Sequence, residues 1–307
     1  MSRIVECVPN FSEGRRTDII EAIVEPFRKT PGVKLLDYSP DADHNRMVVT
    51  AVGDPARLPD AVFEAVRIAS TLIDMEQHQG AHPRMGATDV VPLIPIREVK
   101  MEECVALARD LGRRIGDELG IPVFLYEAAA TSPARVNLAD IRKGEYEGWK
   151  TKIALAEWAP DFGPARLHPT AGATVVGARM PLIAFNVNLN TQDIKVANAI
   201  ARAIRHISGG LRYVKALGVE LKDRGMVQVS INMTDYTRTP LYRALELIRA
   251  EARRYGVSVA ETEIVGLTPV QALVDAAAYY LQLSGFSPDT ILENRLQDWP
   301  PESGEVG

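Results

Sequence analysis

The segment EQHQGAHPRMGATDVVPLIPI, residues 76–96, concentrates side chains that can move protons. It holds His78, His82 and Arg84 together with two glycines. Pro83 pushes the backbone of His82 toward an extended conformation, so the imidazole can project from a stiffened turn. An imidazole that titrates near neutral pH can take a proton from one amine and return it to another. His82 is therefore the candidate for proton transfer, and the alternative is a solvated or hydrogen-bonded loop residue.

Two patterns would suit a metal ion. His78 and His82 have the i, i+4 spacing of a helical metal site, but the glycine and proline around them oppose a helix. The run SPDADHNR clusters Asp41, Asp43 and His44, which could form a hard-cation or hydrolase site or an acidic turn between strands. The acidic turn is the preferred interpretation, and no metal is expected.

A second segment, GPARLHPTAG from Gly163 to Gly172, could bind a flat ligand. Its two prolines stiffen the backbone, and its two glycines allow a ligand to approach closely. The alternative is an ordinary connection before the apolar run ATVVGAR. Neither a Walker spacing nor a GxGxxG after a strand is present, so a nucleotide loop and a dinucleotide fold are not supported.

Strand-like and helix-like runs alternate along the chain, which predicts layered α/β architecture with helices on one face of each sheet. The run VVPLIPI contains two prolines, which predicts a strand that is either bulged or at a sheet edge. The main predicted helices span residues 19–27, 58–73, 101–119, 192–207, 239–255 and 269–283.

The second half repeats the strand and helix order of the first, with a boundary expected at the Met180-Pro181 step. This predicts an N-terminal domain, 1–180, and a C-terminal domain, 181–307. Three strands end in asparagine before a polar loop and a helix, which favours an internal duplication. Two such domains would leave a cleft or tunnel between them for a ligand.

The composition excludes several classes of protein. The 307 residues are 46% hydrophobic, enough for stable cores, and the net charge of −5 offers no general attraction to nucleic acid or anionic membranes. No run approaches the ~20 apolar residues of a membrane span, and the start lacks the features of a signal peptide. We expect a cytoplasmic protein whose two cysteines, Cys7 and Cys104, are reduced core residues.

Four blocks of the sequence resemble the formiminotransferase family and occur in the family's order. They are IVECVPNFSEGR, IDMEQHQGAHPRMGATDVVPLIPI, AEWAPDFGPARLHPTAGATVVGAR with LIAFNVNL, and IVGLTPVQALVDAAAYYL. The resemblance implies an α+β fold of two tandem ferredoxin-like subdomains that face each other across a ligand tunnel. It also implies that His82 is the catalytic acid and base. The implied folate-binding residues are Gly163, Pro164, Ala165, Arg166, Leu167, His168, Pro169, Thr170, Ala171 and Gly172.

The implied reaction transfers the formimino group of N-formimino-L-glutamate to N5 of tetrahydrofolate or its polyglutamates, a step of histidine degradation. Candidate residues for binding the substrates are Asn10, Arg46, Arg84 and Arg179, because guanidinium groups pair with carboxylates. The chain ends at Gly307, whereas animal relatives carry a cyclodeaminase domain, so a separate cyclodeaminase is expected. A homodimer is expected from the frequency of dimers among soluble enzymes.

One position departs from the family pattern. Family members carry an acidic residue near Ser39, and the acids nearby in this chain are Asp37, Asp41 and Asp43. Which of them supports His82 stays open. The alternative functions are a 5-formyltetrahydrofolate cyclo-ligase, a metal-dependent formiminoglutamate hydrolase that uses Asp41, Asp43 and His44, and a folate-binding protein without catalysis.

Overall fold

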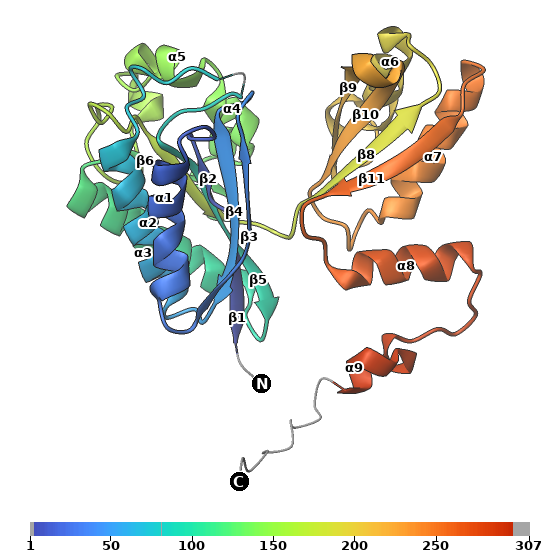
Figure 1. Cartoon of the computed structure of the whole chain (residues 1–307), viewed down its shortest axis with the longest axis horizontal. Coiled ribbons are helices and arrows are strands. Elements are labelled where there is room, and N and C mark those ends of the chain that lie inside the picture. The colour runs from blue at the N-terminus through green and yellow to red at the C-terminus, as the bar shows by residue number, and fades with distance from the viewer. Residues whose placement is uncertain (1–2, 81, 297–307) are drawn as a thin grey trace. The chain divides into compact units, whose positions relative to one another are not determined.

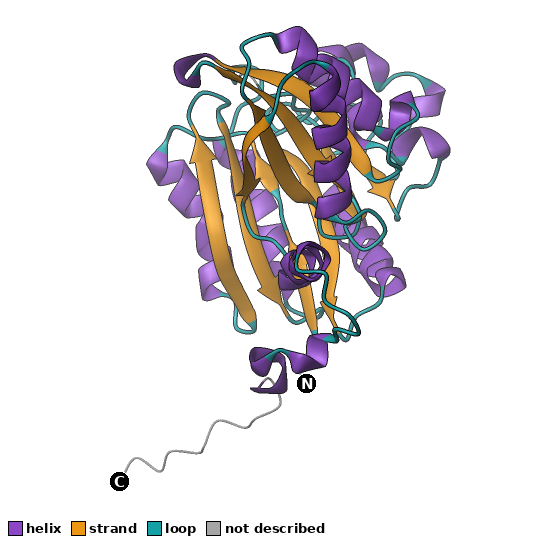
Figure 2. Ribbon diagram, turned by 90° about the vertical axis from the view of Figure 1, so that its right-hand side faces the viewer, coloured by secondary structure: helices purple, strands orange, loops and turns teal. Residues whose placement is uncertain are grey.

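A computed structural model describes residues 3–80 and 82–296. The chain divides into two compact units between Met180 and Pro181. Each unit is built on its own β-sheet and has its own hydrophobic core (Figure 1). Figure 2 distinguishes the strands of these sheets from the helices that cover them. No helix in the described ranges is long and apolar enough to cross a membrane.

The described part of the first unit holds a seven-stranded sheet in the order β1-β4-β2-β5-β7-β6, with β3 paired to β4. The strands are β1 (Ile4–Cys7), β2 (Asn10–Phe11), β3 (Val33–Asp41), β4 (Arg46–Gly53), β5 (Thr88–Arg97), β6 (Val123–Glu127) and β7 (Thr174–Ala178). The helices are α1 (Thr17–Lys29), α2 (Leu58–Leu72), α3 (Met101–Leu119), α4 (Leu138–Arg142) and α5 (Glu145–Lys152). Both β1 and β2 pair with β4 and β5, so together they fill one position of the sheet.

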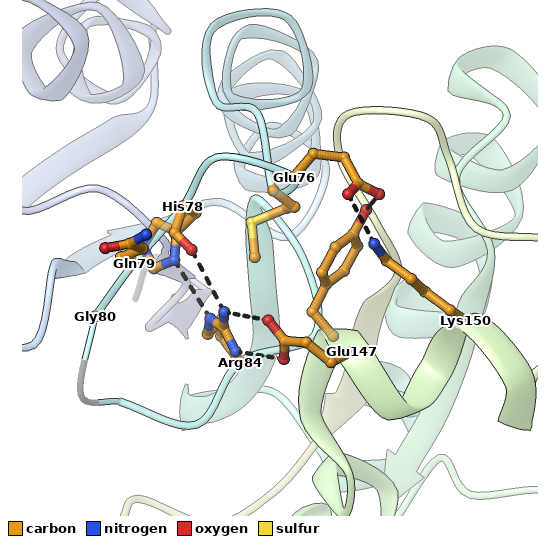
Figure 3. Close-up of a pocket in the computed structure, with 9 residues that line it drawn as sticks. Glu76, His78, Gln79, Gly80, Arg84, Glu147 and Lys150 are labelled. Atoms are coloured by element: carbon orange, nitrogen blue, oxygen red, sulfur yellow. Dashed lines mark hydrogen bonds and ion pairs between the residues drawn. The ribbon is translucent and has the colours of Figure 1, made fainter.

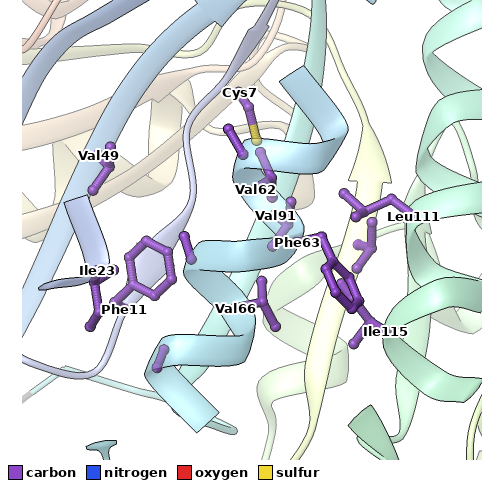
Figure 4. Packing of buried hydrophobic residues seen from close by; sticks show 14 of the residues in the cluster. Cys7, Phe11, Ile23, Val49, Val62, Phe63, Val66, Val91, Leu111 and Ile115 are labelled. Atoms are coloured by element: carbon purple, nitrogen blue, oxygen red, sulfur yellow. The ribbon is translucent and has the colours of Figure 1, made fainter. Parts of the chain in front are cut away.

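Helices α1, α2 and α3 cover one face of this sheet. Figure 4 shows residues of the core that this packing buries. Their apolar stripes bury Ile23, Val62 and Leu111 against Phe11 and Val91 of the strands. Burial of each large apolar side chain contributes about 1.5–3 kcal/mol. The predicted helices 58–73 and 101–119 are confirmed as α2 and α3, because the apolar residues of both recur at the helical period.

The other face of the sheet is also covered at its β5-β7-β6 end, by the segment that contains α4 and α5. Successive residues of β6 point to opposite faces, so Phe124 packs with Trp149 of α5 while Leu125 packs under α3. The sequence predicts helices on one face only. Parallel strands with apolar residues on both faces require cover on both sides, which α4 and α5 supply here.

Strand β5 lies inside the sheet, between β1 with β2 on one side and β7 on the other. Its register shifts against β1 near Pro95 and against β2 near Thr88. Of the two predictions from its prolines, the bulged strand is confirmed and the edge strand is wrong. The pairing of β5 with β7 stops at Leu93, so Pro95 lacks an N–H where β5 has a single neighbour.

The described part of the second unit holds an antiparallel four-stranded sheet in the order β11-β8-β10-β9. The strands are β8 (Ile183–Leu189), β9 (Val214–Leu221), β10 (Met226–Met233) and β11 (Val259–Val265). The helices are α6 (Ile194–Ile204), α7 (Leu241–Arg254), α8 (Val270–Tyr280) and α9 (Leu292–Leu296). Helices α6 and α7 share the main core of this sheet.

The second unit follows the β-α-β-β-α-β order of a ferredoxin-like fold. The first unit has the same order from β1 and β2 to β5, and continues through α3, β6 and β7. The chain therefore contains two tandem α+β subdomains.

Candidate functional site

The long connection from α2 to β5, residues 73–87, carries His82 and makes close backbone contacts on both sides of it. A Cβ atom at Gly80 would lie 2.2 Å from the carbonyl oxygen of His44, and one at Gly86 would lie 2.1 Å from that of Ala173. Atoms cannot approach so closely, so both positions require glycine. The two glycines on either side of His82 thus allow this connection to pack against its neighbours.

The β3–β4 turn holds the first half of this connection through Asn45. The Asn45 side chain donates to the carbonyl of Gln79 (2.9 Å) and accepts from the backbone N–H of Gly14 (3.0 Å). The carbonyl of Asn45 lies 3.0 Å from Nε2 of His78. Asn45 has a φ of 47°, in the left-handed region that asparagine tolerates better than most residues. A single turn residue therefore ties three segments together.

Arg84 holds the second half of the connection against α5 (Figure 3). Arg84 is 7% exposed, and its guanidinium group pairs with Glu145 (2.9 Å) and Glu147 (2.7 Å). The Nε of Arg84 also donates to His78 at 3.3 Å. Because two carboxylates already engage Arg84, the geometry favours a bracing role over the predicted role in binding substrate.

A pocket of about 380 Å³ lies beside this brace (Figure 3). The described residues that line it are Met75, Glu76, His78, Gln79, Gly80, Arg84, Tyr146, Glu147 and Lys150. Within it, Lys150 pairs with Glu76 (2.7 Å) and Arg84 pairs with Glu147. These charges compensate one another, and His82 is not among the lining residues, so we do not place the reaction there.

His82 is half-buried at the end of the sheet where β4 and β5 begin. Its ring centroid is 6.4 Å from that of His44, and no hydrogen bond joins its ring to another described residue. Burial, together with the charges of Arg46, Arg142 and His44, lowers the pKa of His82 to about 3, against an opposing effect of Asp41. The expected titration near neutrality is therefore wrong for this environment. The imidazole is neutral at pH 7, and its low pKa makes it a weaker base than a free imidazole.

Asp41, one of the three acids left open by the sequence, is connected to this environment through His44. Its carboxylate accepts from the backbone N–H of His44 (2.9 Å) and lies 2.7 Å from Nδ1 of the His44 ring. The backbone hydrogen bond from His44 is the largest cause that lowers the pKa of Asp41. No group of three or more metal-ligating side chains occurs among the described residues.

Arg46 and Arg142 bring positive charge to His82 from two different elements. Arg46 is the first residue of β4, and burial lowers its pKa, as does the charge of Arg142. Arg142 ends α4 and pairs with the buried Asp89, which also accepts from the backbone N–H of Met85 (2.8 Å). The sequence predicted Arg46, and Asp89 lies in the segment 76–96 that was singled out with His82, but Arg142 was missed, since no local motif relates α4 to the histidine.

The segment from Gly163 to Gly172 reaches the same connection. The backbone N–H of Met75 donates to the carbonyl of Thr170 (2.8 Å), and Gly172 pairs with Gly86 in a β-bridge. Its beginning lies against α3, because a Cβ at Gly163 would be 3.2 Å from the Cα of Gly116. The structure thus brings the C-terminal end of the predicted folate segment next to the connection that carries His82.

His168 stabilises a turn inside that segment. Its Nδ1 accepts from the backbone N–H of Ala171 at 3.0 Å, so the ring proton of the neutral imidazole is on Nε2. Burial lowers the pKa of His168. The exposed Arg166 forms no hydrogen bond or ion pair with another described residue, which leaves its charge available for an anion.

The other two predicted binding residues differ in their distance from His82. Asn10 pairs with Val48 and Val90 near the start of β4 and β5, and its side-chain amide donates to the carbonyl of Val8 (3.2 Å). Arg179 follows β7, and its backbone N–H donates to Leu93 (3.1 Å). Leu93 follows Thr88 by five steps along the strand, or roughly 16 Å. Arg179 is therefore not brought together with the first residues of β5, where His82 lies.

Comparison with known proteins assigns both units to one family. Residues 4–179 match the N-terminal subdomain of the formiminotransferase domain, and residues 184–293 match the formiminotransferase domain. The chain belongs to the formiminotransferase family, and it is a transferase of one-carbon groups.

Several relatives of known activity indicate which kind of one-carbon transferase this chain is similar to. A glutamate formimidoyltransferase of Streptococcus pyogenes serotype M1 is 53% identical over 96% of this chain and 99% of that protein. One from Thermoplasma acidophilum is 52% identical over 96% of this chain and 97% of that protein. The formimidoyltransferase-cyclodeaminase of Mus musculus is 46% identical over 91% of this chain, which matches 53% of that protein. The first two relatives are thus similar to this chain over nearly their whole length.

Proposed function

We propose that this enzyme is a glutamate formimidoyltransferase, which moves the formimino group of N-formimino-L-glutamate to N5 of tetrahydrofolate and releases glutamate. Family membership and the names of the relatives support this activity. The structural observation that carries the proposal is the setting of His82. It is a neutral imidazole without a hydrogen bond to another described residue, at the meeting point of the α2–β5 connection, the β3–β4 turn and α4.

His82 would move one proton between two nitrogens. N5 of tetrahydrofolate attacks the formimino carbon, so the C–N5 bond forms and a tetrahedral intermediate results. His82 takes the proton that leaves N5 and then gives it to the glutamate nitrogen as the bond from carbon to that nitrogen breaks. The proton lost by one amine is gained by the other, so the transfer needs no net acid or base. Most of the rate would come from holding the two reactants together.

The segment from Gly163 to Gly172 is proposed to bind the folate. Its attachment to Met75 and Gly86 would place a bound pterin close to the connection that carries His82. Arg166, which is exposed, would suit the carboxylates of the folate tail. The same proposal includes four further features. They are two sheets that face each other across a tunnel, a cytoplasmic location, a homodimer and a role in histidine degradation.

The test is incubation of the purified protein with N-formimino-L-glutamate, with and without tetrahydrofolate, while glutamate release is followed. The proposal expects release that requires tetrahydrofolate, needs no ATP and survives a chelator. Release without tetrahydrofolate that a chelator abolishes would indicate the metal-dependent hydrolase. Formation of methenyl-folate from 5-formyltetrahydrofolate only with ATP would indicate the cyclo-ligase. Tight folate binding without any turnover would indicate a binding protein.

A further inference from the structure

Arg46 carries a positive charge that no described residue pairs with. It forms no ion pair with any described carboxylate, and its Nε is buried without a hydrogen-bond partner. A partly buried cation without a direct ion pair is costly, because desolvation penalises the charge and the charges of Asp41 and Asp89 offset only part of the loss. A site that retains such a group is suited to an anionic ligand.

Arg142 also has a buried nitrogen without a hydrogen-bond partner. One side of its guanidinium group pairs with Asp89, whereas its Nε is buried and has no hydrogen-bond partner. Asp89 is itself 2% exposed and fixed by the backbone N–H of Met85, so it holds Arg142 in one place. The remaining donors of Arg142 are therefore oriented before any ligand binds.

The two arginines lie on the same face of the first sheet. Met47 belongs to the core under α1, α2 and α3, and alternate strand residues point to opposite faces, so Arg46 points to the face away from these helices. Helix α4 lies on that face, because its Ile141 packs with Met85 in the second, smaller core. The Arg142 side chain pairs with Asp89 of β5, and its charge acts on both His82 and Arg46, so it reaches the same region.

The carboxylates of this region leave Arg46 without a direct partner. Asp89 pairs with Arg142, and Asp41 accepts from the backbone N–H of His44 and lies 2.7 Å from Nδ1 of its ring. A bound carboxylate could accept hydrogen bonds from the guanidinium groups of Arg46 and Arg142.

We propose that Arg46 and Arg142 together bind the α-carboxylate of the formimino donor beside His82. The inference rests on the proposed function, and it names the part of the donor that this site recognises. In N-formimino-L-glutamate the α-carboxylate is bonded to the same carbon as the departing nitrogen. A carboxylate held by these arginines therefore places the nitrogen that must be protonated near His82. The glutamate tail of folate is separated from N5 by the aminobenzoyl ring, so the donor accounts for a carboxylate at this place.

Binding of this carboxylate would also change the proton affinity of His82. The groups whose charges act most on its ring are Arg46, Arg142, His44 and Asp41. A bound anion would offset the two guanidinium charges, so the pKa of His82 would rise from its low value when the donor is present. The imidazole would become a stronger base only in the presence of the group whose transfer it assists.

The test compares the binding of two ligands by the wild type, two site variants and one control variant. The variants are Arg46→Gln, which leaves no described carboxylate without its partner, and Arg142→Lys, which keeps a charge beside Asp89 but loses the planar fork. Arg67→Gln on the exposed surface of α2 is the matched control. The ligands are glutamate and its α-amide, compared as product inhibitors, together with the Michaelis constants of both substrates.

The wild type and the Arg67→Gln control should prefer glutamate to its α-amide by roughly 10- to 100-fold. Both site variants should lose most of this preference. The donor KM should rise by a similar factor in Arg46→Gln, with little change in the KM for tetrahydrofolate. An unchanged preference for glutamate over its α-amide in both variants would overturn the proposed carboxylate site. A higher KM for tetrahydrofolate, but not for tetrahydropteroate, would assign the arginines to the folate tail and also overturn it.

A titration of His82 by NMR separates this role from a purely structural one. Glutamate should raise the pKa of His82 in the wild type and have a smaller effect in Arg46→Gln. No rise in the wild type would contradict the proposal. If the protein shows no formimino transfer at all, the proposed function fails. Calorimetry of glutamate and its α-amide with the wild-type protein would then still decide the site, because equal binding of the two rejects it.

Discussion

The two units share the order β-α-β-β-α-β but differ in the connection between their second helix and fourth strand. In the first unit this connection runs over residues 73–87 and carries His82, Arg84 and the two close-contact glycines. In the second unit it covers only residues 255–258. The same scaffold therefore carries the proposed catalytic histidine in one copy and a short turn in the other. The proposed function depends on the length and attachments of a loop, and the fold alone does not determine it.

The turns between the second and third strands of the units show the same contrast at a finer scale. In the first unit the left-handed residue is Asn45 (φ 47°), and in the second it is Gly225 (φ 61°). Glycine adopts this conformation without strain, whereas asparagine supplies a side chain that binds Gln79 and Gly14. The first unit uses a less favourable residue where its turn must hold the reactive connection.

The largest expected difference concerns two glycines in the compared connections. Gly86→Ala would place a Cβ 2.1 Å from the carbonyl oxygen of Ala173, and should lower the free energy of unfolding of the first unit by about 3 kcal/mol. At Gly256, where φ is 67° and no atom lies within 4 Å, alanine should cost about 1 kcal/mol. Urea unfolding followed by circular dichroism and tryptophan fluorescence measures both. Equal effects would mean that the long connection is not closely packed.

A smaller difference is expected for the two turn residues. Asn45→Ala removes two hydrogen bonds and leaves the buried N–H of Gly14 unpaired, which should cost about 2 kcal/mol. The turnover number should also fall, because Gln79 is released. Gly225→Asn should change the free energy of unfolding by about 1 kcal/mol or less, since asparagine tolerates a positive φ. The comparison is contradicted if Asn45→Ala leaves both stability and turnover unchanged.

A further expected effect is a dependence of stability on pH from His82. Its pKa is about 3 in the folded protein and near the ordinary 6.5 in the unfolded chain. Between pH 3 and pH 6.5 the unfolded chain binds a proton on His82 that the folded protein does not bind. This contribution to stability is therefore complete above about pH 6.5 and is lost as the pH falls toward 3.

NMR titration of the His82 ring, assigned with His82→Gln, should show no protonation between pH 7 and pH 5. The fall of stability over the same range should be less steep in His82→Gln, by roughly 2 kcal/mol between pH 7 and pH 5. A ring that titrates near 6.5 in the free protein would contradict the described environment.

Elements whose apolar residues recur regularly were predictable from the sequence. Elements in which another residue interrupts that pattern were not. Helix α2 was predicted to within one residue because its apolar stripe is regular. Strand β9 was missed because Gly218 interrupts it. A Cβ there would lie 2.7 Å from the side chain of Asn198 in α6, so close packing of helix on strand removed the apolar signal.

The site was predictable only where its residues lie in one segment of the sequence. His82 and its glycines form such a segment. Arg142 and Asp89 are far apart in the sequence and meet through the path of α4 across the sheet, which no local pattern encodes. The low pKa of His82 has the same origin, because burial and the two arginines come from tertiary structure. The bracing of Arg84 by α5 was equally invisible in the sequence.

The most direct test of the account compares His82→Ala with His44→Ala in glutamate release from N-formimino-L-glutamate. The two rings are 6.4 Å apart, so both variants remove an imidazole from the same region. The account predicts that His82→Ala lowers turnover by roughly 10²- to 10⁴-fold with little loss of folate binding. His44→Ala should lower turnover much less. Turnover near that of the wild type in His82→Ala would contradict the assignment of proton transfer to His82.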